Sequence, residues 1–227
     1  MPEYKIRPIA HIESDFATKF GIPRQAGIVE ELESRIVFED EYANPDALRG
    51  IEGFSHLWLI WQFSENLSEN WSPTVRPPRL GGNTRLGVFA TRSPFRPNSL
   101  ALSCVRLLRV EKDEKRGLCL IVGGADLMNG TPIFDIKPYI PYADCHPDAL
   151  SGFAPDSGAT LEVEFESGAC KNLPPEKREA LAKALANDPR PRYHKDPNRV
   201  YAMEFAGEEI KFRVREDKLT VLNTPAD

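Results

Sequence analysis

The stretch LCLIVGGADLMNGTPIFDIKPYI, residues 118–140, decides the fold class. Its two ends are short apolar runs rich in branched side chains, which is typical of β-strands. Between them, Asn129 and Gly130 form a pair that readily adopts positive φ at a tight reversal. We therefore expect two strands here, joined as a hairpin.

Similar runs recur along most of the chain and predict a mainly β protein. They are YKIRPIA, HLWLIWQF, TRLGVFAT, LALSCVRLLRV and TLEVEFE, which begin at residues 4, 56, 84, 100 and 160. The segment NPDALRG predicts a single helical turn with Asn44 as its cap, Pro45 in the first position and Gly50 as its stop. The chain lacks the glycine-rich patterns of dinucleotide-binding and P-loop folds, so a doubly wound nucleotide domain is not expected.

The pattern changes after about residue 166. The segment LPPEKREALAKALANDP, residues 173–189, starts with prolines and places Leu181 and Leu185 at helical spacing, which predicts a helix. The alternating segment VYAMEFAGEEIKFRVRED, residues 200–217, predicts two strands joined at Ala206 and Gly207. We therefore expect a first domain over residues 1–166 and a small α/β domain over residues 167–227.

The composition argues against a disulfide-stabilised, a metal-binding and a membrane-spanning protein. With 227 residues, 41% of them hydrophobic, the chain is long enough for a core that needs no disulfides. Its four cysteines stand far apart with no CxxC spacing, which fits a reducing cytoplasm, and its four histidines are scattered, so no metal site is expected. No apolar run approaches the ~20 residues that span a bilayer, so no membrane segment is expected either.

Charge is distributed unevenly along a chain whose formal net charge is −5. No acid occurs between Glu69 and Glu111, and the arginines in that interval are Arg76, Arg79, Arg85, Arg92, Arg96, Arg106 and Arg109. Neighbouring prolines stiffen the backbone around Arg92 and Arg96, and fixed guanidinium groups suit phosphates and carboxylates. As a set, these arginines predict an anionic ligand, although any single arginine is better explained by pairing with acids elsewhere in the fold.

Two neighbours of these arginines allow two interpretations each. Asn98 has an amide that suits either a base edge or a turn cap. Phe95 suits either stacking on a base or burial.

The residues Asp135, Lys137 and Tyr139 alternate and therefore point to one face of a strand, which Ile133 would share. The opposite face would carry the apolar residues Phe134, Ile136, Pro138 and Ile140. The polar face is either a solvated sheet surface or a catalytic group that orients or deprotonates a substrate amine. From these residues alone the two interpretations are equal.

The segment RPPRLGGNTRLGVFATRSPFRPNS, residues 76–99, resembles the TsaA-like family of tRNA methyltransferases. The resemblance extends over FGIPRQAG at 20–27, RGIEGFSHLWLIWQF at 49–63, NGTPIFDIKPYIPYAD at 129–144 and DPRPRY at 188–193. It implies a β-barrel outside the Rossmann-like methyltransferases, a homodimer, and S-adenosylmethionine as cofactor. The implied reaction methylates the exocyclic nitrogen of the adenosine immediately 3′ of the anticodon, once that base carries threonylcarbamoyl.

The resemblance also implies a set of site residues. The cofactor contacts would be Gln25, Ala26, Gly27, Phe63, Ser64, Arg92, Leu102, Asn129, Gly130, Thr131 and Pro132. The chain departs from the family in carrying Ser99 where a proline is usual and Ala101 where a glycine is usual. It also carries Ser64 and Asn129 where His and Asp are frequent.

If the chain catalyses this reaction, hypotheses follow for its catalytic and tRNA-binding residues. Asp135 or Tyr139 would accept the proton of the amine, and Lys137 would tune the site electrostatically. The residues expected to contact the tRNA anticodon region are Arg96, Asn98, Arg190, Arg192 and Lys195. For the last three, within DPRPRYHKDPNR, a proline-stiffened linker is an almost equal interpretation.

Two other functions remain open at the level of sequence. One is an RNA-binding module without activity, which arginines and aromatic residues also suit. The other is a methyltransferase that acts on a small molecule. Steep salt dependence of binding would separate a nucleic-acid substrate from a small metabolite.

Overall fold

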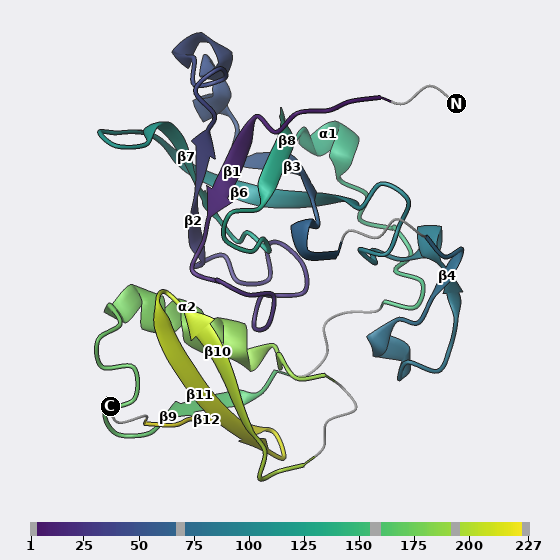
Figure 1. Ribbon diagram of the computed structural model, residues 1–227, viewed down its shortest axis with the longest axis vertical. Helices are drawn as coiled ribbons and strands as arrows, with labels where there is room; N and C mark the ends of the chain where they lie inside the picture. The colour runs from purple at the N-terminus through teal and green to yellow at the C-terminus, as the bar shows by residue number, and fades with distance from the viewer. Residues whose placement is uncertain (1–3, 67–70, 155–159, 192–195, 224–227) are drawn as a thin grey trace.

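Six strands close into a β-barrel with the order β1-β2-β7-β6-β3-β8 (Figure 1). The computed structural model describes residues 4–66, 71–154, 160–191 and 196–223. The barrel strands are β1 (Ala10–Glu13), β2 (Glu33–Phe38), β3 (His56–Gln62), β6 (Leu100–Asp113), β7 (Gly117–Gly123) and β8 (Pro132–Pro138). The expected mainly β class and the barrel implied by the resemblance are thus confirmed.

The barrel core follows from the alternation of side chains along its strands. In β3, Leu57, Leu59 and Trp61 are buried, whereas the residues between them are only partly covered. These side chains pack against Ile12, Ile36, Val105, Leu120, Leu127 and Ile133 from the other barrel strands and the segment after β7. The tryptophan-rich strand therefore has one face in the core and one face available to line a site.

The hairpin expected over residues 118–140 is wrong, although both strands exist. β7 pairs with β2 and β6, and β8 pairs with β1 and β3. The turn at Asn129 and Gly130 is held by other parts of the chain, since Asn129 N donates to Phe16 O at 2.8 Å and Gly130 N donates to Ile12 O at 2.7 Å. Barrel closure places β8 beside β1, and such a distant pairing leaves no local signal in the sequence.

A β-bulge changes which residues share a face of β8. Ile60 pairs with Asp135, but the next residue, Trp61, pairs with Ile133, so residue 134 is an extra residue in β8. Ile133 is fully buried, whereas Asp135 lies on the outer side of the barrel. The expectation that Ile133 shares a face with Asp135 is therefore wrong, because the bulge resets the alternation.

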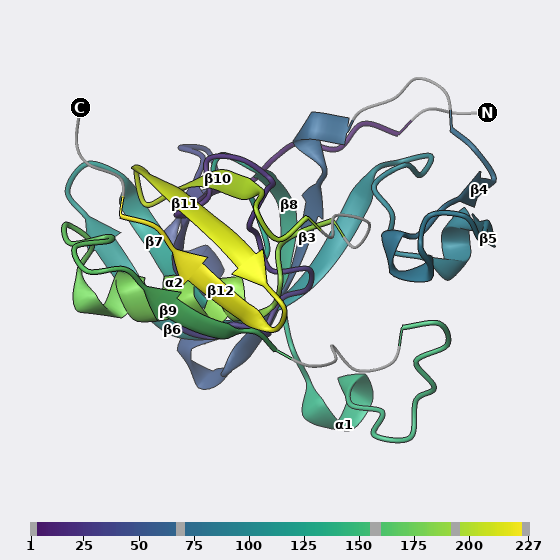
Figure 2. The same cartoon turned by 90° about the horizontal axis from the view of Figure 1, so that it is seen from below.

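A second sheet has the strand order β10-β11-β12-β9 and packs against helix α2 (Figure 2). Its elements are β9 (Glu162–Phe165), α2 (Pro175–Ala186), β10 (Val200–Phe205), β11 (Glu208–Arg215) and β12 (Lys218–Val221). The expected helix and the strand pair joined at residues 206–207 are present, the latter paired antiparallel. β9 pairs in parallel with β12, so this strand belongs to the second sheet although it precedes the predicted boundary at 166.

One apolar cluster joins the second sheet to the N-terminal part of the chain. Phe16, Val29 and Leu32, which lie between β1 and β2, pack with α2 and with β10, β11 and β12. The ring of Phe16 meets that of Phe205 edge to face, with centroids 5.3 Å apart. The segment that carries residues 23–27, the PRQAG loop, is therefore fixed by both sheets.

The remaining elements are short. They are the 3-10 helices η1 (Pro45–Leu48), η2 (Ile51–Gly53), η3 (Ser64–Asn66), η4 (Pro78–Leu80) and η5 (Val88–Ala90), the strands β4 (Thr74–Val75) and β5 (Leu86–Gly87), and helix α1 (Pro141–Asp144). The Asn44 side chain accepts from Asp46 N at 3.0 Å, as expected for the cap of η1. β4 and β5 form a separate ribbon to one side of the barrel, and none of the helices described is long and apolar enough to cross a bilayer (Figure 1).

Candidate active site

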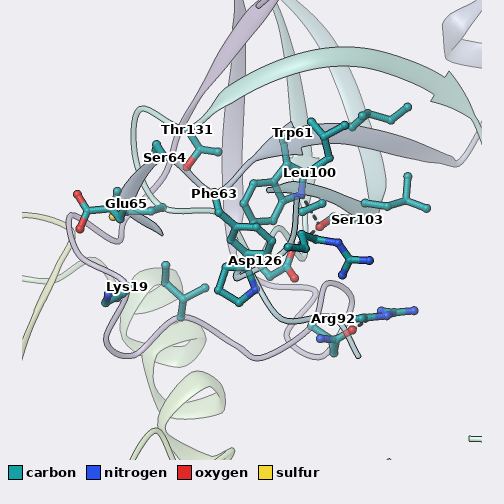
Figure 3. A pocket seen from close by; sticks show the side chains of 18 of the residues that line it. Lys19, Trp61, Phe63, Ser64, Glu65, Arg92, Leu100, Ser103, Asp126 and Thr131 are labelled. Carbon is teal, nitrogen blue, oxygen red and sulfur yellow. Dashed lines mark hydrogen bonds between the residues drawn. The ribbon is translucent and has the colours of Figure 1, made fainter. Parts of the chain in front are cut away.

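A cavity of about 950 Å³ opens where the end of β3 and the start of β6 meet three loops (Figure 3). The loops contribute residues 22–25, several residues between 89 and 98, and residues 126, 128 and 131. Its apolar wall includes Ile22, Trp58, Ile60, Trp61, Phe63, Phe89, Leu100 and Leu102. Mainly apolar walls with a few polar groups are typical of cofactor and substrate sites of this size.

Arg92 reaches the PRQAG loop from the arginine segment. Its Nη1 donates to the side-chain oxygen of Gln25. Gly27 N donates to Gly124 O at 2.9 Å, which ties this loop to the end of β7. Two segments far apart in sequence are thereby joined at the edge of the cavity.

Arg96 supports its own loop as well as lining the cavity. Its Nη1 donates to Thr91 O at 3.0 Å and to Ser93 O at 3.5 Å. Ser99 N donates back to Arg96 O at 3.2 Å, and Ser99 adopts a left-handed backbone with φ 45°. Ser99 O in turn accepts from Phe63 N at 3.0 Å, so the loop also positions Phe63.

Asp126, which no sequence pattern singled out, lies on the cavity wall at the end of a chain of hydrogen bonds. Trp61 Nε1 donates to Ser103 Oγ at 2.9 Å, and Ser103 Oγ donates to Asp126 Oδ1 at 2.6 Å. Burial raises the pKa of Asp126, although the hydrogen bond from Ser103 and the charge of Arg92 act in the opposite direction. A carboxyl group within the otherwise apolar run IVGGADLM was the available signal.

The structure brings part of the predicted cofactor set together. Gln25, Phe63, Ser64, Arg92, Leu102 and Thr131 line the cavity. Ala26, Gly27, Asn129, Gly130 and Pro132 are chain neighbours of these residues and are not part of the lining. Arg96 and Asn98, which were expected to contact tRNA, also line the cavity.

The three residues predicted to be catalytic lie beside the cavity wall, since Asp135 and Lys137 pair with Ile60 and Trp58, which line the cavity. Asp135 and Lys137 form an exposed ion pair of 2.9 Å on the outer side of β8. Tyr139 packs against the rings of His56 and Trp58, with centroid distances of 6.1 and 5.8 Å. None of the three lines the cavity within the part of the chain that the structure describes.

The second basic segment is only partly described. Arg190 forms two hydrogen bonds with the carboxylate of Asp188, at 2.8 and 2.9 Å, so its guanidinium group stabilises its own loop. Arg192 and Lys195 lie outside the described residues. In the first segment, Arg106 and Arg109 form ion pairs with Glu30 and Glu33, so for these two the pairing interpretation is confirmed.

Metal chemistry has no candidate centre in residues 4–66, 71–154, 160–191 and 196–223. No group of three or more His, Cys, Asp or Glu side chains there is placed to hold a metal ion.

Comparison with known families matches two domain models to this chain. The tRNA-methyltransferase O N-terminal domain matches residues 11–145, and the TrmO C-terminal domain matches residues 158–226. The two matches leave residues 146–157 between them, which differs from the boundary at 166 expected from sequence.

Relatives of similar length share much of the sequence. The chain is 39% identical over 225 residues to the tRNA (adenine(37)-N6)-methyltransferase of Escherichia coli strain K12, with 95% of each chain covered. It is 47% identical over 164 residues to the protein of the same name from Eikenella corrodens, over 72% of this chain and 92% of the relative. A crystal structure of TrmO from Pseudomonas aeruginosa superimposes with a TM-score of 0.81 at 32% identity, over 98% of both chains.

Proposed function

Because the chain belongs to the tRNA-methyltransferase O family, we propose that it methylates the exocyclic nitrogen of the adenosine 3′ of the anticodon in tRNA. The observation that carries this proposal is the pair of family matches, which together span residues 11–145 and 158–226. The names of the curated relatives specify the same atom and the same position. The finer features of the substrate, cofactor and assembly are inferred below.

S-adenosylmethionine is the methyl donor that the cavity fits. A relative from Pseudomonas aeruginosa, 37% identical over 229 residues, is named as a putative S-adenosylmethionine-dependent methyltransferase. The apolar walls near Phe63 and Leu102 suit the adenine ring, while Gln25, Ser64 and Arg92 offer polar groups for the ribose and amino-acid ends. When bound, this cofactor supplies an activated methyl group.

The arginine segment supplies a surface for tRNA beside the cavity. Arg76, Arg85 and Arg92 are exposed there, and no acid occurs from residue 70 to residue 110. Trp71 and Phe89 are 52% and 73% exposed and stack on each other at 6.2 Å, and Phe89 also lines the cavity. Exposed rings among cations are the features that bind unpaired nucleotides.

We infer that the substrate base already carries threonylcarbamoyl. That group adds a carboxylate, and the guanidinium groups of Arg92 and Arg96 on the cavity wall are suited to bind it. We also propose that the protein acts as a homodimer and in the cytoplasm, where tRNA is modified.

The reaction is tested with labelled S-adenosylmethionine and two tRNAs of one sequence, one carrying threonylcarbamoyl and one unmodified. We expect label on the modified tRNA alone, because only that substrate offers the carboxylate that Arg92 and Arg96 are suited to bind. Equal labelling of both would remove the role of threonylcarbamoyl and leave the methyltransferase. Label on neither would favour an RNA-binding module or an enzyme for a small molecule.

A further inference from the structure

The ionisable groups on the cavity wall limit which residue can accept a proton there. Among its described lining residues there is no His, Cys or Tyr, and the cations are Lys19, Arg24, Arg92 and Arg96. Protonated Lys and Arg side chains are donors only. Glu65 and Asp126 are therefore the two side chains of the described wall that can act as a base.

These two carboxyl groups occupy different environments. Glu65 is exposed in η3, at one edge of the cavity, where water competes for any proton. Asp126 lies on the inner wall near Ser103 and Phe63, and the two acids are well separated (Figure 3). A proton acceptor that acts during methyl transfer must reach the reacting nitrogen, and the inner position is suited to this.

The hydrogen bonds around Asp126 have a fixed direction. An indole N–H can only donate, so the Trp61 group requires Ser103 Oγ as an acceptor at 2.9 Å. The single hydroxyl proton of Ser103 is then directed to Asp126 Oδ1 at 2.6 Å. Oδ1 is thereby held as an acceptor, and the carboxyl group is oriented by two residues of β3 and β6.

The balance between burial and these hydrogen bonds gives Asp126 the properties of a base. Burial raises its pKa, which makes its carboxylate more basic than that of an exposed aspartate. The Ser103 hydrogen bond and Arg92 lower the pKa and so limit the rise. Among the proposed catalytic residues, Asp135 lacks such an environment, since it is paired with Lys137 on the outer side of β8.

We propose that Asp126 is the catalytic base that accepts the proton of the exocyclic nitrogen during methyl transfer, with Trp61 and Ser103 as its positioning residues. This inference rests on the proposed function. The nitrogen–carbon bond forms as the donor's sulfur–carbon bond breaks and the sulfur keeps the electron pair. The proton lost by the nitrogen moves to the Asp126 carboxylate and then to water.

The test compares wild type, Asp126→Asn and Asp135→Asn in single-turnover methylation of threonylcarbamoyl-tRNA across pH. Circular dichroism confirms folding, and calorimetry gives the Kd of S-adenosylmethionine for each variant. We expect D126N to lose about 10²- to 10⁴-fold in rate, the usual contribution of a general base, while its Kd for the cofactor changes little. D135N tests the rival assignment, and if Asp126 is the base its rate falls far less than that of D126N.

The pH profile separates a base from a structural residue. The carboxylate is needed, so the wild-type rate rises with pH through the raised pKa of Asp126 and then levels off. Ser103→Ala removes a hydrogen bond that lowers this pKa, so its rising limb moves to higher pH. A purely structural role would lower the rate of S103A at every pH without moving that limb.

The possible results distinguish failure of the proposed function from failure of the proposed role of Asp126. No methylation by the wild type overturns the proposed function itself. Wild-type activity together with an unimpaired D126N rate overturns the role of Asp126 alone. If D126N does not fold, a pH profile of S103A that is not shifted overturns the role of Asp126 as the base. Loss of activity in D135N would assign the role of the base to Asp135.

Discussion

Ser99 adopts a backbone conformation that most residues avoid. Its φ is 45°, in the left-handed region that disfavours side chains with a Cβ by about 1 kcal/mol. Its amide donates to Arg96 O, and its carbonyl accepts from Phe63 N at the cavity wall. A proline in this position could have neither this φ nor an amide proton.

Replacing Ser99 tests this conformation. We expect Ser99→Pro to lower the free energy of unfolding by more than about 1 kcal/mol, because both the φ and the amide hydrogen bond are lost. Its affinity for S-adenosylmethionine should fall as well, since Phe63 is displaced. Ser99→Gly is the control and should stay within about 1 kcal/mol of wild type, because glycine tolerates positive φ. Urea titration measures both, and an S99P protein as stable as wild type would contradict the assignment.

At the residue scale, the sequence predicted which segments meet at the cavity. Six of the residues predicted to contact the cofactor line the cavity, because the segments named in the sequence analysis form its loops and strand ends. Asp126 could not be assigned in advance, since its hydrogen-bonding partners come from β3 and β6 and its burial depends on barrel closure. An acidic residue in an apolar run indicates that it has a hydrogen-bonding partner in the fold, but the sequence does not say which residue that partner is.

The ribbon of β4 and β5 and the residues that flank it are proposed to bind tRNA through exposed side chains. Trp71 contacts Phe89 and does not line the cavity, whereas Arg76 is an exposed cation at the end of β4. Stacking and phosphate contact differ in their dependence on salt, since only phosphate contact releases counterions. The two contributions can therefore be measured separately on one element.

We expect Trp71→Ala to weaken tRNA binding by about 1 to 3 kcal/mol with an unchanged salt slope, as for lost base stacking. Arg76→Ala should reduce the slope of log Kd against log salt by about one. Filter binding over a range of salt concentrations measures both. Wild-type affinity and slope in both variants would mean that the ribbon contacts no tRNA.

The elements that were predicted correctly are those with local causes. Helix η1 depends on its cap and its proline, and α2 depends on the spacing of its apolar residues. In both cases the residues that decide the structure are close neighbours in sequence. The pairing of β7 and β8 and the bulge in β8 depend on distant strands, so the hairpin and the face of Ile133 were predicted wrongly. Local signals identify strands, and barrel closure decides their neighbours.

At the scale of the whole molecule, the shared apolar cluster couples the two sheets. Phe205 of β10 is fully buried against Phe16, and all three tryptophans, at 58, 61 and 71, lie outside the second sheet. We expect Phe205→Ala to cost about 3 to 5 kcal/mol and to lower the urea midpoint reported by tryptophan fluorescence. Val200→Ala on the same strand is the control, since Val200 is 51% exposed. An unshifted fluorescence midpoint in F205A would show that the sheets unfold independently.

The apolar cluster shared by the two sheets has a consequence for synthesis on the ribosome. Phe16, Val29 and Leu32 emerge well before β10, β11 and β12, with which they pack. Until those strands have emerged, these side chains stay exposed, and exposed apolar surface favours aggregation and chaperone binding. A nascent chain that stops before β10 therefore keeps this apolar surface uncovered.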